Sequence, residues 1–293
     1  MFRSIHKLTR RQALASFALP MLERMLLAKA PPGRIQLGCQ TNAWPIHPAD
    51  SNTLFSAIAS IRDLGFSGFE TGFANVVPLA QDPAALKQHA RGLALFGVHI
   101  FQLQYDPATL LASSDLIAKV ADLGAKMGFE RLILSGAPAN DAAALKGKIE
   151  ALNRYGEQAK ELGLTLAYHN HGPECQGANP EIESLMAGTD PNFVSFLLDA
   201  GHAFDAGADV VALVKRHAER LTGLHLRDYR NGKQVPLGKG DFPLAAVANE
   251  LRRKNWSGWA LAEEERLDGS KPGNAAAAPA IAALHNAFGA RTE

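Results

Sequence analysis

The feature that most constrains this chain is the regular alternation of short apolar runs with longer amphipathic stretches from residue 34 onward. Apolar runs of about four to eight residues are typical of buried strands, and amphipathic stretches of about ten or more are typical of helices. Each apolar run is followed by one amphipathic stretch, and the segments that connect them are short. The runs predicted to be strands are residues 35–40, 68–71, 98–103, 131–134, 164–169, 193–198, 221–226 and 256–262.

Glycine follows four of the amphipathic stretches, at the position where a helix commonly ends in a left-handed residue. These glycines are Gly65, Gly97, Gly128 and Gly163. The helices are therefore expected over residues 53–64, 83–96, 109–127, 142–162, 180–187, 210–219, 244–254 and 275–288.

Eight strand–helix units in series predict a parallel sheet, and eight such strands close naturally into a barrel. The alternative is a doubly wound open sheet, which favours a glycine-rich phosphate loop after its first strand. Residues 40–45 read QTNAWP and are not such a loop. No linker marks a domain boundary, and 293 residues suit one α/β barrel. We expect a single (β/α)8 TIM barrel over residues 34–293.

The first 30 residues have the order of features found in a twin-arginine export signal. Arg10 and Arg11 precede an apolar region over residues 15–21, and residues 28–30 form an Ala-Lys-Ala site. Glu23 and Arg24 interrupt the apolar part. We predict a signal peptide over residues 1–30 and a periplasmic or otherwise exported protein. The alternative is an amphipathic N-terminal helix on a cytoplasmic protein.

Charge and cysteine content exclude several classes of protein. The net charge of the whole chain is +1, and removal of residues 1–30 leaves 24 basic against 28 acidic side chains. A nucleic-acid-binding surface needs a concentration of basic groups, so no nucleic-acid partner is expected. No later run is long and apolar enough for stable membrane insertion. Cys39 and Cys175 fit no metal motif and are interpreted as unrelated thiols.

Two histidines follow one another at alternate positions where the fifth predicted strand ends. The segment is Tyr168-His169-Asn170-His171. Because successive side chains of a strand point to opposite faces, His169 and His171 share a face. Paired imidazoles at a strand end suit a divalent-metal site or an acid/base site.

Polar groups also end the next three strands, and the carboxyl ends of barrel strands form the functional face. Singly, each could be a helix cap, a surface ion pair or a solvated edge. Together they predict a mixed nitrogen and oxygen site for Zn²⁺, Mn²⁺, Co²⁺ or Fe²⁺. His99, inside the third strand, is interpreted as structural, and His47, His89, His217 and His285 as loop or helix-surface residues. The strand-end groups are Asp199 and His202, His225, Arg227 and Asp228, Glu263 and Glu265, with Glu70 after the second strand.

These segments resemble the xylose-isomerase-like TIM barrels, the sugar phosphate isomerase/epimerase superfamily. The resemblance is closest to the branch with a Tyr-His-Asn-His segment, near inosose-dehydratase-like members. It covers most of the chain from about residue 34, in the same order. The matching segments are 166–171 (LAYHNH) with Glu174, 198–202 (LDAGH), 224–228 (LHLRD), 237–242 (LGKGDF) and 258–263 (GWALAE).

The resemblance implies one divalent ion (Mn, Zn, Co, Fe or Mg) held by His169, Asp199, His225 and Glu263. His169 stands where many relatives carry glutamate, so this chain departs from the pattern of epimerases that use two metal-bound glutamates. Glu174 recurs in the same branch and is assigned a catalytic role. The groups assigned to substrate binding are Glu70, His202, Arg227 and Glu265.

The expected reaction is removal of a proton next to the carbonyl of a sugar or keto-sugar, with Glu263 or His171 as the base. Return of the proton gives isomerisation or epimerisation. Loss of a β-substituent would instead make the protein a lyase or dehydratase on a keto-inositol or 3-keto-sugar. The remoter alternatives are a DNA-repair endonuclease, which the charge disfavours, and a non-catalytic sugar-binding barrel. A homo-oligomer is left open.

Overall fold

The computed structural model describes residues 33–101, 107–178, 180–264 and 269–289. The predicted signal peptide over residues 1–30 and the predicted substrate residue Glu265 lie outside these residues. Side chains are described within them, apart from residues 107–114.

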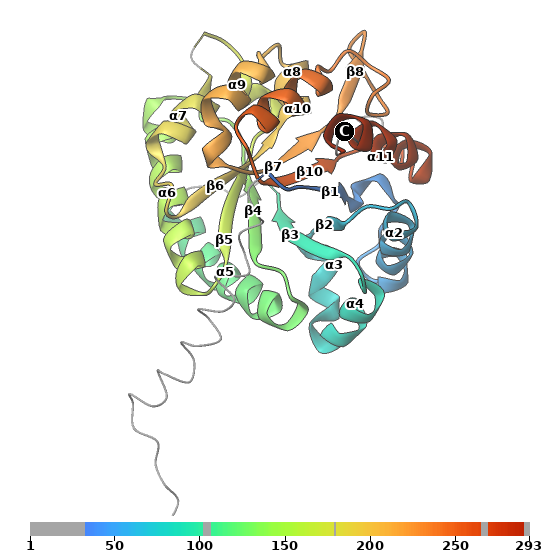
Figure 1. Ribbon diagram of the computed structural model, residues 1–293. Coiled ribbons are helices and arrows are strands. Elements are labelled where there is room, and N and C mark those ends of the chain that lie inside the picture. The colour runs from blue at the N-terminus through green and yellow to red at the C-terminus, as the bar shows by residue number, and fades with distance from the viewer. Residues whose placement is uncertain (1–32, 102–106, 179, 265–268, 290–293) are drawn as a thin grey trace, which may run out of the picture.

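Eight parallel strands close into a barrel in the order β1-β10-β7-β6-β5-β4-β3-β2, and this confirms the predicted TIM barrel (Figure 1). The doubly wound alternative is wrong, because β1 pairs with both β2 and β10 and leaves no open edge. The barrel strands are β1 (Ile35–Gln40), β2 (Gly68–Gly72), β3 (Ala94–Ile100), β4 (Arg131–Ser135), β5 (Thr165–His169), β6 (Val194–Asp199), β7 (Leu221–Leu226) and β10 (Gly258–Ala262).

Helices surround the barrel, each packing an apolar face against the strands (Figure 1). The α-helices are α2 (Ser51–Asp63), α3 (Phe73–Val76), α4 (Pro83–His89), α5 (Pro107–Met127), α6 (Ala142–Glu161), α7 (Glu181–Gly188), α8 (Ala200–Asp205), α9 (Val210–His217), α10 (Leu244–Arg253) and α11 (Asn274–Phe288). The 3₁₀ turns are η1 (Thr41–Ala43), η2 (Val77–Gln81), η3 (Gly172–Cys175) and η4 (Ala218–Arg220). The short elements α3 and α8 and the 3₁₀ turns were not predicted.

The boundary between α4 and β3 differs from the prediction. The helix expected over residues 83–96 ends at His89, and β3 begins at Ala94. Gly92 provides the left-handed turn residue, with a φ of +85°. Gly97 therefore does not end a helix; it lies within β3, where a side chain would collide with Ile133. The other three expected helix-ending glycines do have positive φ values.

A two-stranded antiparallel hairpin, β8 (Asp228–Arg230) with β9 (Lys233–Val235), follows β7 and was not predicted. The buried carboxylate of Asp228 organises the loop after it by accepting backbone N–H groups at 2.8–2.9 Å. The donors are Tyr229, Gly238, Gly240 and Phe242. Asp228 was predicted as one of the polar strand-end groups. In the structure its carboxylate binds the backbone of this loop.

The barrel interior is filled by a separate apolar cluster, distinct from the core between strands and helices. Its members are Phe96, Ile133, Ala167, Leu197, Trp259 and Leu261. His169, Asp199 and Glu263 each lie two residues beyond a member of this cluster. Because side chains alternate along a strand, these three groups point to the interior as well. The barrel thus carries a polar layer directly above an apolar one.

Candidate metal centre at the carboxyl ends of the strands

Four side chains from four neighbouring strands meet above the apolar interior. They are His169, Asp199, His225 and Glu263, all buried, and each offers one ligand atom within 4.8 Å of the others. The strand register sets this meeting, because it places Asp199 beside His225 and His225 beside Leu261. The four groups predicted as metal ligands are therefore brought together.

The nitrogens of two histidines face one another within this cluster. His169 Nε2 lies 2.9 Å from His225 Nδ1, 3.5 Å from Asp199 Oδ2 and 3.7 Å from Glu263 Oε2. His225 Nδ1 also contacts Glu263 Oε2. Two nitrogens and two carboxylates in this arrangement fit a divalent cation of the Zn²⁺, Co²⁺ or Fe²⁺ kind.

Opposite charges shift the pKa values of the cluster. Burial would lower the pKa of His169 and His225, but the neighbouring carboxylates raise both. For His225 these carboxylates are Glu263 and Glu70. Burial would raise the pKa of Asp199 and Glu263, but nearby cations hold both well below their usual range. Both carboxylates are therefore ionised at neutral pH.

Arg227 follows β7 and is the cation shared by both carboxylates. Its Nε lies 3.0 Å from Asp199 Oδ2, and its Nη2 lies 2.9 Å from Glu263 Oε2. The side chain is only 2% exposed. This predicted substrate-binding group therefore also balances the negative charge of two predicted ligands.

His171 and His202 lie at the edge of the cluster. The His171 ring lies 5.2 Å from the His169 ring and 5.5 Å from the His202 ring, between centroids. Burial, with the charges of His169 and His202, lowers the pKa of His171 to about 4. His202 Nε2 lies 3.7 Å from Asp199 Oδ2, while Asp199 Oδ1 accepts the backbone N–H of His202. Both histidines thus lie beside predicted metal ligands, and their contact with a substrate stays a prediction.

Glu174, predicted to be catalytic, is fully buried beneath the loop that carries His171. Its Oε1 accepts hydrogen bonds from Lys148 Nζ (2.6 Å) and Tyr168 Oη (2.5 Å). Its Oε2 accepts the backbone N–H of His171 at 2.7 Å. Lys148 also contacts Glu181 at 2.6 Å. The hydrogen bond from the His171 backbone holds the start of this loop against Glu174, and a catalytic role for Glu174 stays a prediction.

Glu70 and His99 extend the cluster across the barrel interior. Glu70 Oε2 lies 2.8 Å from His225 Nε2, and Glu70 Oε1 lies 3.2 Å from His99 Nδ1. The His99 ring centroid lies 4.8 Å from that of His169. His99, interpreted from the sequence as unrelated to the site, is therefore part of its surroundings. Its one sequence signal was its place in a predicted barrel strand, and in the structure it is the penultimate residue of β3.

Two asparagines that the sequence reasoning passed over also support the site. Asn42, in η1, donates to Glu263 Oε1 at 2.7 Å. The Asn170 side chain accepts the backbone N–H of Asp199 at 3.0 Å and donates to its carbonyl at 3.1 Å. Asn170 thereby fixes the end of β6 against the end of β5.

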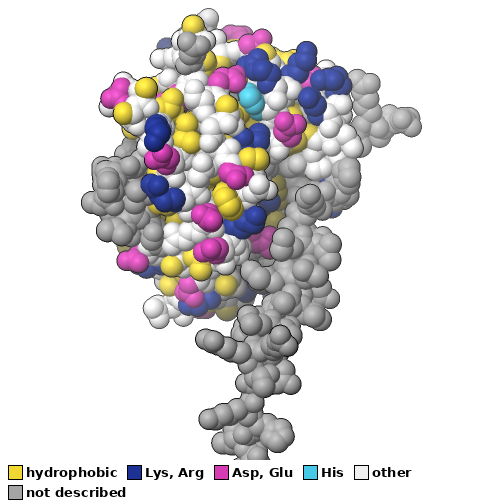
Figure 2. All heavy atoms as spheres, turned by 90° about the vertical axis from the view of Figure 1, so that its left-hand side faces the viewer, with side chains coloured by type: hydrophobic (Ala, Val, Ile, Leu, Met, Phe, Trp, Pro, Cys, Tyr) yellow, Lys and Arg dark blue, Asp and Glu magenta, His cyan; other side chains and the backbone are white. Residues whose placement is uncertain are grey.

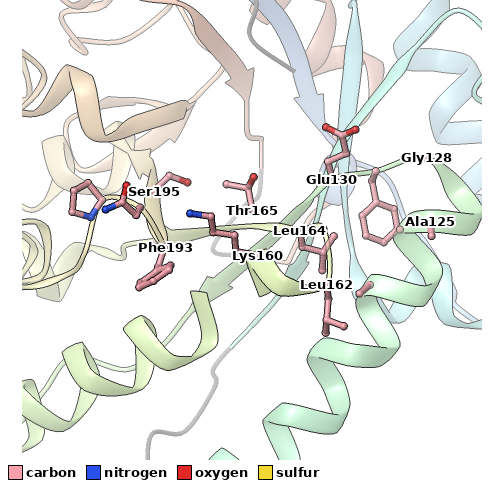
Figure 3. Close-up of a pocket in the computed structure, with 15 residues that line it drawn as sticks. Ala125, Gly128, Glu130, Lys160, Leu162, Leu164, Thr165, Phe193 and Ser195 are labelled. Atoms are coloured by element: carbon pink, nitrogen blue, oxygen red, sulfur yellow. The ribbon is translucent and has the colours of Figure 1, made fainter. Parts of the chain in front are cut away.

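The hollow drawn in Figure 3 lies elsewhere on the molecule. It has a volume of about 430 Å³ and is lined by Leu162, Thr165 and Ser195, among others. Thr165 begins β5 and Ser195 is the second residue of β6, so this hollow lies at the amino ends of the strands. It is therefore separate from the polar cluster.

The surface has a mixed charge pattern. On the face shown in Figure 2, basic side chains lie among acidic ones.

None of the helices in the described ranges is long and apolar enough to cross a membrane. Cys39 and Cys175 are both buried free thiols.

The profile of the xylose isomerase-like TIM barrel family matches residues 58–287. This chain belongs to that family. The match covers the segment from α2 to α11 and therefore includes all four residues of the cluster.

Two relatives are named inosose dehydratase. The protein of Lactiplantibacillus plantarum is 34% identical over a stretch that covers 40% of this chain and 45% of that relative. The matched region of this chain thus spans less than half the length of this relative. The protein of Clostridium perfringens is 26% identical, and that match covers 79% of this chain and 90% of the relative.

A solved structure shares the fold. It is a sugar phosphate isomerase/epimerase from Parabacteroides distasonis, with a TM-score of 0.73 and 18% identity. The superposition covers 87% of this chain and 100% of that chain. At this identity the likeness supports the architecture alone.

Proposed function

We propose that this protein is a divalent-metal-dependent enzyme that removes a proton next to the carbonyl of a sugar or keto-sugar. The observation that carries the proposal is the convergence of His169, Asp199, His225 and Glu263 at the carboxyl ends of four adjacent strands. A bound cation would act there as a Lewis acid on adjacent substrate oxygens. Membership of the xylose isomerase-like family supports the same class of chemistry.

The residues around the cluster are assigned to two tasks, orientation of the substrate and removal of the proton. Arg227 and His202 stand beside the ligands and would orient hydroxyl or carbonyl oxygens of the substrate. Glu263 is already engaged by Arg227 and His225, whereas His171 lies at the edge of the cluster. His171 is therefore the better placed of the two predicted bases to take the proton from carbon.

Two outcomes of proton removal are open to this site. The proton can return to the neighbouring carbon or to the opposite face, which isomerises or epimerises the substrate. Alternatively, a β-hydroxyl can leave with a proton as water, which is a dehydration. The two relatives named inosose dehydratase favour dehydration of a keto-inositol or 3-keto-sugar as the second candidate.

The test combines metal analysis with a substrate panel. Purified protein is analysed for bound metal and incubated in D₂O with keto-sugars and keto-inositols under NMR, and enone absorbance reports dehydration. Wild type is expected to hold one divalent ion and to place deuterium next to the carbonyl. D199A and E263A should lose the metal, and turnover should fall by about 10²–10³-fold. The exposed-residue variant D122A is the control.

Retention of full metal content and full turnover by D199A and E263A would exclude this proposal.

Export remains a prediction tied to residues 1–30. Fractionation of cells that express the full chain, compared with a variant in which Arg10 and Arg11 are replaced by lysine, tests it.

A further inference from the structure

Glu70 crosses the barrel interior to reach a predicted metal ligand. It lies on β2, whereas His225 lies on β7, and β1 and β10 separate these strands in the barrel. Glu70 Oε2 nevertheless lies 2.8 Å from His225 Nε2, and both side chains are fully buried. The interaction is therefore a contact across the interior and not one between paired strands.

The other nitrogen of the same ring faces the cluster. His225 Nδ1 lies 2.9 Å from His169 Nε2 and contacts Glu263. A neutral imidazole carries one N–H and one lone pair. If Nε2 donates its hydrogen to Glu70, the lone pair of Nδ1 is directed at the cluster, which is the state that a metal ligand needs.

Glu70 is itself held by a second buried pair. His99 Nδ1 lies 3.2 Å from Glu70 Oε1, and His99 Nε2 lies 3.1 Å from Ser135 Oγ. His99 and Ser135 are at most 1% exposed. Side chains from β4, β3 and β2 thus lead, one after another, to the ring on β7.

We propose that Glu70 is a positioning residue that holds His225 with Nδ1 turned toward the metal, and that His99 and Ser135 hold Glu70 in turn. This role replaces the substrate-binding role expected for Glu70 from the sequence. The inference rests on the proposed metal site, and it adds a requirement outside the four ligands.

The first test measures metal affinity without substrate. Zinc binding to wild type and E70Q is followed by competition with a chromophoric chelator. E70Q is expected to raise the zinc dissociation constant by about 10–100-fold, the usual cost of losing the partner of a ligating histidine. E181Q removes a partly buried carboxylate from the Lys148 group instead, and it should bind zinc as wild type does.

The outcomes separate the two proposals. Zinc binding by E70Q that equals that of wild type overturns the role of Glu70 and leaves the proposed function standing. Failure of wild type to bind any divalent metal overturns both.

A second measurement is made on wild type. Histidine ¹⁵N NMR of the zinc-loaded protein should show His225 protonated at Nε2 and metal-bound at Nδ1, with the ring signals assigned through their bonds to the His225 backbone. Zinc on Nε2 would overturn the inference. In folded E70Q, the His225 ring should no longer be held in the form protonated at Nε2. Loss of that one signal, with the other histidine signals unchanged, supports a positioning role and not a general structural effect.

Discussion

At the scale of single residues, Gly201 allows two segments that carry the cluster to approach closely, because it has no Cβ atom. It lies two residues after Asp199, where α8 passes over the backbone of Arg227. A Cβ atom at this position would lie 2.5 Å from Arg227 Cβ and 2.9 Å from its backbone nitrogen. Neither neighbour can move freely, because Arg227 is buried and paired with two carboxylates.

We expect G201A to lower the free energy of unfolding by about 1–3 kcal/mol, since it overpacks a buried contact. It should also weaken metal binding, because it displaces Asp199 or Arg227. Urea denaturation and the chelator competition measure the two effects. The matched control is G147A, inside α6, where a Cβ meets nothing within 4 Å. G147A should stabilise the protein by up to about 1 kcal/mol, and equal effects of the two variants would contradict this account.

At the scale of elements, buried or partly buried charges join helices to the loops that carry the site. Lys148 on α6 binds Glu174 in η3 and Glu181 on α7, both at 2.6 Å. Because Lys148 is 2% exposed and Glu174 is fully buried, removal of Lys148 would leave the Glu174 carboxylate buried without its cationic partner. The position of His171 thus depends on α6, the helix that directly precedes β5.

The contact between α7 and α9 predicts a pH dependence of stability. Glu183 lies 2.5 Å from Arg216 and 2.6 Å from His217. Burial would raise the pKa of Glu183, but its hydrogen bonds with these two residues lower it below the ordinary 4.5. A lowered pKa stabilises the folded state above the unfolded pKa, and this contribution is lost as the pH falls through the folded value.

E183Q should therefore be less stable than wild type at pH 7, by no more than about 1 kcal/mol because the pair is partly exposed. The difference should shrink as the pH falls below 4.5. Urea denaturation of both proteins between pH 7 and pH 3 checks this, with E161Q as an exposed control. A difference that stays constant over this range would show that the ion pair does not stabilise the fold.

At the scale of the whole molecule, the periodicity of the sequence predicted the barrel and the rim on which the polar strand-end groups lie, and the family resemblance selected the four residues of the cluster among them. The reason is physical: strand ends in a parallel barrel share one rim, so strand-end residues such as His169, Asp199 and Glu263 meet whatever their separation in sequence. Contacts across the interior follow no such rule. The interaction of Glu70 with His225, and the place of His99, depend on which side chains fill the barrel, which a pattern of apolar runs does not specify.

The same reasoning explains the errors along the chain. The β8–β9 hairpin is held by the carboxylate of Asp228 and not by an apolar period, so periodicity could not detect it. The early end of α4 depends on a left-handed turn at Gly92, which competed with Gly97 for the same role.

Because the proposed ligands come from four strands of one closed barrel, metal binding should stabilise the molecule as a whole. A ligand at 100 times its dissociation constant stabilises a folded protein by about 2.7 kcal/mol. For a domain of this size we expect a rise in Tm of roughly 5–10 °C on addition of zinc. Calorimetry with and without zinc measures the rise, and a chelator should reverse it. D199A should show no rise and D122A the full rise. An equal rise in D199A would mean that zinc stabilises the barrel from a site other than this cluster.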